Sequence, residues 1–123
     1  MASQSTAAAA PVRVSLRRAA GAQARQAMLD SWLATVPAAP RAVIAEGTFA
    51  DFAVPDDVTV ARVAAGCVCC VGLVPLRVTL TRLLRTVRPR ALLLLVATDD
   101  HLPRLRAMLA AGELGAVTLD EAA

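Results

Sequence analysis

Three cysteines lie within one short segment, Gly66 to Cys70, and the chain has no others. Cys67, Cys69 and Cys70 can supply thiolates, and thiolate sulfur is a soft donor that suits zinc, cobalt or copper. The three sulfurs converge only if the backbone bends sharply, and Gly66 and Gly72 give the backbone freedom for such a bend. Three ligands leave a fourth tetrahedral position for water, another residue or a partner. The cysteines therefore predict a metal site of the open kind, which suits transfer of the ion.

Two other interpretations of the cysteines stay open. In the first, they are reduced, partly buried small hydrophobic residues with no ligand. In the second, Cys67 and Cys70 form a redox pair, because they stand in C-x-x-C spacing. The extra Cys69 and the apolar Val68 make this pair unlike a simple thioredoxin motif. We favour metal binding, since thiols at this spacing are typical of metal sites.

His101 is the only histidine of the chain, and it is the candidate for a fourth ligand. It follows Asp99 and Asp100 at the predicted end of an apolar strand. That end can face the same side of a parallel sheet as the cysteine segment. The alternative is an exposed or capping histidine. A single histidine without a supporting motif yields no nucleophile, base and orienting acid, so no catalytic residue is predicted.

The segments on either side of the cysteines predict a strand and a helix. Residues 57–63 alternate apolar and polar side chains, which indicates a half-buried strand. From Pro75 onward the apolar residues recur with the spacing of one helix face. Arg82, Arg85 and Arg88 fall on the other side of this helix. They predict a solvated face, with a groove for an acidic partner as the alternative. The thiols thus lie in a strand-to-helix loop, where open α/β sheets bind ligands.

The rest of the chain continues this alternation of strands and helices. We expect further strands at 12–16, 41–45 and 91–97, and further helices at 22–36 and after Asp99 or Asp100. Residues 117–119 either add an edge strand or trail off. The most apolar run, 91–97, predicts a central strand covered on both faces. The fold class is therefore α/β, a mostly parallel sheet with flanking helices in one domain over 12–123. Residues 1–11 are expected to form a flexible tail.

The composition of the chain argues against nucleic-acid and membrane partners. Apolar residues make up 57% of the chain, which is enough for a core, and aromatic residues only 2%, too few for platforms that stack nucleic-acid bases. All basic side chains are arginine, and the net charge of +3 predicts a mildly basic surface and not a nucleic-acid partner. The longest apolar run is too short to span a bilayer, and the first residues lack the pattern of a signal peptide. We therefore expect a cytoplasmic protein without a membrane partner.

The segment Gly66-Cys67-Val68-Cys69-Cys70 resembles the Gly-Cys-x-Cys-Cys motif of CobW-type GTPases. These are P-loop proteins related to metallochaperones for nickel, cobalt and zinc. Residues 43–46 resemble the second strand of that family, with Glu46 near the position of its Asn-Glu pair. Residues 92–99 resemble the strand and turn that usually carry Glu-x-x-Gly. The resemblance implies a P-loop NTPase-like fold, here truncated, because the sequence covers neither the region that reads guanine nor the C-terminal domain of the family.

The phosphate-binding loop of that family is not matched. A working P-loop needs glycines around the phosphates, a lysine on the outer phosphates, and a serine or threonine on magnesium. The best superposition starts at Arg18, and only Gly21 and Ala22 fit the pattern. Ala24 stands at the lysine position and Arg25 at that of the magnesium hydroxyl, and the chain contains no lysine. This degenerate P-loop predicts neither GTP nor Mg²⁺ as a cofactor.

Together these patterns predict a protein that binds or handles a transition metal, zinc first among them, without a competent nucleotide site. One alternative is a metallochaperone with residual GTP binding or GTPase activity. Another is a non-catalytic interaction module. The expected partners are the metal ion and either a second copy of the chain or a client metalloprotein.

Overall fold

Strands and helices alternate along the chain in the computed structural model, which describes residues 12–36, 40–47, 53–63, 73–96, 102–112 and 117–120. The strands are β1 (Val12–Arg18), β2 (Arg41–Glu46), β3 (Val58–Val63), β4 (Ala91–Val96) and β5 (Val117–Asp120). The helices are α2 (Ala22–Thr35), α3 (Leu73–Thr86) and α4 (Leu102–Ala110). The predicted tail, 1–11, lies outside the described residues.

The five strands form one all-parallel sheet in the order β3-β2-β4-β1-β5. This arrangement confirms the predicted α/β class, and it is consistent with a P-loop NTPase-like fold. β4 lies in the middle of the sheet and all six of its residues are buried, as its unbroken apolar run predicts. Residues 117–119, for which two outcomes were open, belong to an edge strand, since β5 pairs with β1.

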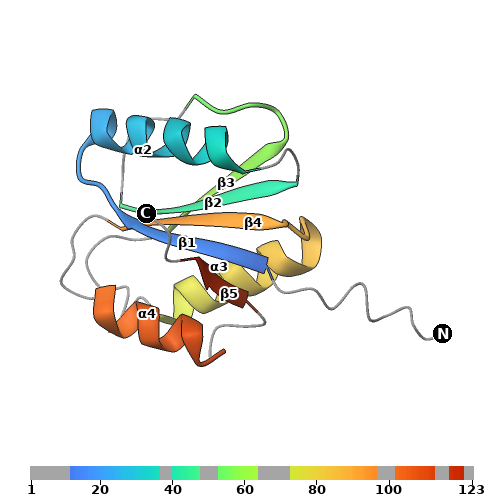
Figure 1. Ribbon diagram of the computed structural model, residues 1–123. Helices are drawn as coiled ribbons and strands as arrows, with labels where there is room; N and C mark the ends of the chain where they lie inside the picture. The colour runs from blue at the N-terminus through green and yellow to red at the C-terminus, as the bar shows by residue number, and fades with distance from the viewer. Residues whose placement is uncertain are drawn as a thin grey trace.

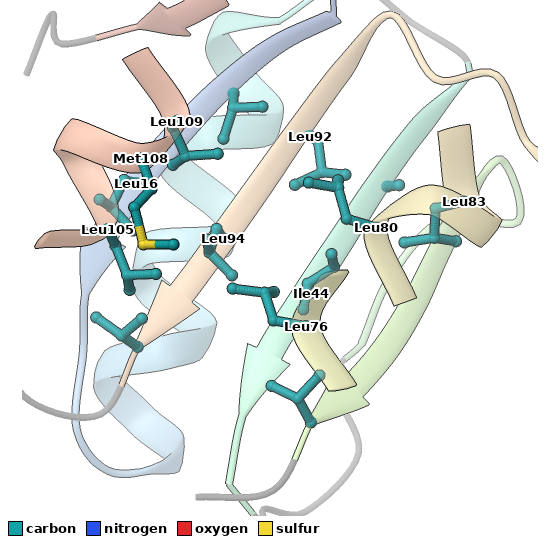
Figure 2. Close-up of a cluster of buried hydrophobic side chains, with 14 residues drawn as sticks. Leu16, Ile44, Leu76, Leu80, Leu83, Leu92, Leu94, Leu105, Met108 and Leu109 are labelled. Carbon is teal, nitrogen blue, oxygen red and sulfur yellow. The ribbon is translucent and has the colours of Figure 1, made fainter. Parts of the chain in front are cut away.

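Helices cover both faces of the sheet (Figure 1): α2 lies on one face, and α3 and α4 lie on the other. Successive side chains of a strand point to opposite faces, so β4 contributes to two cores. Leu93 and Leu95 pack in the layer that contains Leu29 and Trp32 of α2. Figure 2 shows the second layer, in which leucines of α3 and α4 meet the sheet. Its labelled members are Leu16, Ile44, Leu76, Leu80, Leu83, Leu92, Leu94, Leu105, Met108 and Leu109.

Element boundaries differ from the predictions by a few residues. β1 continues to Arg18, two residues beyond the predicted strand, into the region expected to be a turn. The helix expected from Pro75 begins at Leu73, so Pro75 is the third residue of α3. Proline is tolerated there because the first amides of a helix have no intrahelical acceptor. In the described parts of the chain, no helix has both the length and the apolar character needed to cross a bilayer.

Candidate functional site at the carboxyl edge of the sheet

All strands of the sheet end at the same edge, because all are parallel. β1 and β4 are neighbours, yet the helices that follow them, α2 and α4, lie on opposite faces (Figure 1). Such a change of direction between adjacent strands opens a crevice at their carboxyl ends, which is where α/β sheets bind ligands. The last residues of the strands at this edge are Arg18, Glu46, Val63, Val96 and Asp120.

The predicted metal ligands Cys67, Cys69, Cys70 and His101 lie outside the described residues. The structure fixes the points from which their segments depart, namely Val63 at the end of β3 and Val96 at the end of β4. Only β2 separates β3 from β4, so these ends are about 10 Å apart at a strand spacing of nearly 5 Å. Within the described ranges, no group of three His, Cys, Asp or Glu side chains could hold a metal ion.

The turn between β1 and α2 lies at this edge, beside the end of the central strand β4. Its backbone is attached to the neighbouring strand, because the Ala19 amide donates a hydrogen bond of 2.9 Å to the Val96 carbonyl. Gly21 precedes the first residue of α2 with a φ of 85° and a ψ of 150°, a conformation that is essentially restricted to glycine. The Gly21 carbonyl accepts the first helical hydrogen bond, at 3.1 Å from the Arg25 amide. The turn thus uses its glycine to start the helix.

The four residues of the degenerate P-loop differ in exposure. Arg18 and Ala24 are exposed, as is Gly21. Arg25, in contrast, is completely buried, on the same face of α2 as Leu29 and Trp32. Its Nε donates a hydrogen bond of 2.8 Å to the carbonyl of Ala19, inside the turn. The side chain aligned with the magnesium hydroxyl therefore serves the turn itself.

Burial lowers the pKa of Arg25, and the negative charge of Glu46 acts in the opposite direction. Glu46 is itself buried, at the carboxyl end of β2. The two side chains therefore bring opposite charges to the carboxyl edge of the sheet, near enough for Glu46 to act on Arg25. Next to Glu46, the Gly47 amide donates a hydrogen bond of 2.8 Å to the Val63 carbonyl, which extends the ladder to the point where the cysteine segment begins.

From the sequence, Arg25 was interpreted only as a position of the degenerate P-loop, and its structural role was missed. A signal was present, because Arg25 shares the face of α2 that buries Leu29 and Trp32, at spacings of four and seven. A residue with that spacing faces the core whatever its type.

Asp57, the first residue of the strand predicted at 57–63, directly precedes β3 in the structure and has a charged partner. The Arg41 guanidinium pairs with the Asp57 carboxylate through Nε at 3.0 Å and through Nη2 at 2.9 Å. Arg41 begins β2 and Asp57 directly precedes β3, so this ion pair lies at the amino edge, opposite the candidate site. It joins the starts of two strands and plays no part in the chemistry of the carboxyl edge.

No protein-family model, curated protein or solved structure matches this chain. The likeness of its cysteine segment to the CobW-type motif therefore stays a prediction from the sequence.

Proposed function

We propose that this chain binds a transition metal ion, with zinc the first candidate, through the thiolates of Cys67, Cys69 and Cys70. The observation that carries the proposal is that all three cysteines fall between β3 and α3. The strand leads to the carboxyl edge of a parallel sheet, and loops at that edge are the ligand-binding loops of α/β folds. The protein would handle the ion and would not hydrolyse a nucleotide.

The donor set supports a thiophilic metal. Sulfur is a soft ligand that selects zinc or copper over magnesium or calcium. Among the described residues, Glu46 is the carboxylate at the end of β2, the strand next to β3, and its charge already acts on Arg25. A fourth ligand could come from His101, whose segment departs from β4, the second neighbour of β3. Water or a partner's side chain would serve equally in an open site.

The β1–α2 turn supports a function without nucleotide. Phosphate binding in a P-loop depends on backbone amides and a lysine that face the ligand. Here the Arg25 guanidinium is buried and bonded to the carbonyl of Ala19, and the chain has no lysine. Glu46, buried at the carboxyl end of β2, adds negative charge at this edge that would repel a triphosphate. Residual GTP binding is thus the weaker alternative.

Thiolates at such a site need a reducing compartment, so we place the protein in the cytoplasm. The sheet ends in two edge strands, β3 and β5, and edge strands invite pairing with another chain. A second copy or a client metalloprotein is therefore the partner that we propose, as the sequence led us to expect.

Native mass spectrometry after zinc loading tests the proposal. The wild-type chain should retain about one zinc ion, and a variant with Cys67, Cys69 and Cys70 all changed to serine should retain none, because a serine hydroxyl is a poor zinc ligand. If His101 is the fourth ligand, His101→Ala weakens retention without abolishing it. Failure of the wild-type chain to hold zinc, or equal retention by the serine variant, refutes the metal site.

A titration with nucleotide tests the alternative that the chain binds GTP. A fluorescent GTP analogue with magnesium present should show no saturable binding to the wild-type chain, since the turn lacks the groups that grip phosphates. Saturable binding by the wild-type chain would revive the GTPase alternative and end our proposal.

A further inference from the structure

The outer face of α3 carries three arginines around one exposed apolar side chain. These residues line a shallow hollow of about 430 Å³. They fall in two rows, each with a spacing of four, so the hollow is the groove between two adjacent rows of helix side chains. The first row is Arg77, Thr81 and Arg85, and the second is Val78, Arg82 and Thr86. We call these six residues the arginine face.

The positive charge of the arginine face is not balanced from within the described residues. There, no ion pair or hydrogen bond engages the guanidinium of Arg77, Arg82 or Arg85. The sequence gives a reason, because residues 58–98 contain six arginines and no aspartate or glutamate. Neighbouring turns of a helix usually supply such carboxylates at a spacing of three or four. α3 supplies none.

Val78 sits within this cationic groove and is 50% exposed. The opposite side of the helix buries Leu76, Leu80 and Leu83 against the sheet, so packing within the chain does not use Val78. A single exposed valine is ordinary on a protein surface. Together, however, Val78 and the neighbouring arginines offer an apolar contact and positive charges in one groove. A peptide with mixed acidic and apolar side chains requires both.

We propose that the arginine face is a docking surface for an acidic segment of a partner protein. Arg77 and Arg85 are separated by about 12 Å along the helix axis, the length of about four residues of extended chain. A guanidinium can donate two parallel hydrogen bonds to one carboxylate. Carboxylates of the segment would bind the arginines, and an apolar side chain would cover Val78.

Other polyanions fit this face less well. α3 has no aromatic side chain on which a nucleic-acid base could stack. A cationic line of one short helix also reaches few phosphates of a duplex. A bilayer surface would require a broad apolar face beside the charges, and Val78 is the one exposed large hydrophobic residue among those that the structure describes.

Binding at the arginine face would depend on the charges of α3 and not on the cysteines. The full chain can therefore be tested for peptide binding without added metal. Fluorescence anisotropy of a labelled short peptide with glutamate and leucine at alternate positions would measure binding to the full chain at low salt. The double variant Arg82→Gln/Arg85→Gln should bind the peptide about tenfold more weakly. This is the loss of affinity expected when two exposed ion pairs are removed. Glutamine keeps the helix propensity of arginine, so the fold should persist.

The matched control changes the same charge elsewhere. Arg90 and Arg104 are exposed and lie outside the arginine face, so Arg90→Gln/Arg104→Gln should bind the peptide nearly as the wild type does. A peptide with glutamine for glutamate should not bind. Equal losses in both double variants, or no binding by the wild type, would overturn the proposal. So would tighter binding to a DNA duplex or to vesicles containing phosphatidylserine than to the peptide.

Discussion

Arg25 places a positive charge in the interior, on the face of α2 that also buries Leu29 and Trp32. A buried charge is tolerated only when other groups compensate the loss of water. The carbonyl of Ala19 and the negative charge of Glu46 provide that compensation. At the residue scale, the β1–α2 turn is thus held in place by the protein's own charges.

Changing Glu46 to Gln should destabilise the fold by about 3 kcal/mol, because it leaves a buried positive charge without its counter-charge. Urea unfolding followed by tryptophan fluorescence would measure the loss. Trp32 is the only tryptophan, and the chain has no tyrosine, so the signal reports on the α2 layer alone.

A double-mutant cycle provides the control. Arg25→Met alone should also be destabilising, whereas Arg25→Met combined with Glu46→Leu should lose less than the sum of the two single changes. Strictly additive losses would show that the two charges do not compensate each other.

Arg88 adopts a φ of 52° just after α3 ends, a region that favours glycine. Its amide donates a hydrogen bond of 3.1 Å to the Leu83 carbonyl, which is the geometry of a helix C-terminus capped by a left-handed residue. Arg88→Gly should therefore raise the free energy of unfolding by about 0.5 kcal/mol. Arg90→Gly serves as the control, since Arg90 has no positive φ; an equal gain there would exclude the backbone explanation.

At the scale of elements, periodicity predicted most of the fold. The apolar run of β4 and the helical spacing in α2 and α3 are strong local signals, and the elements found follow them within a few residues. The start of α3 was missed because proline was taken as the first residue, although any position in the first turn accepts it. The conformation of the turn around Gly21 could not be predicted from local patterns, since the turn is bonded to Val96, a distant residue on another strand. The helical spacing of Arg25 did signal its burial.

α3 has two faces of different importance for stability. Leu80 is 2% exposed and packs in the core, whereas Val78 faces outward. Leu80→Ala should lower the free energy of unfolding by about 3 kcal/mol through the cavity it leaves. Val78→Ala should change it by less than about 0.5 kcal/mol. Thermal unfolding followed by circular dichroism compares the two, and similar losses would contradict the orientation of the helix.

For the whole molecule, the all-parallel sheet determines the edge from which the segments with predicted ligands depart. Both segments with predicted ligands depart from one edge, β3 before the cysteines and β4 before His101. At the same edge the β1–α2 turn is fixed by bonds within the protein. A metal bound by thiolates is the chemistry that the sequence and this architecture jointly favour.

Elemental analysis of the chain purified without added metal tests this account most directly. We expect about one zinc ion or other transition-metal ion per chain, and none in the variant with Cys67, Cys69 and Cys70 changed to serine, because those thiolates are the proposed ligands. A wild-type chain that carries no transition metal, or a serine variant with the same metal content, would contradict it.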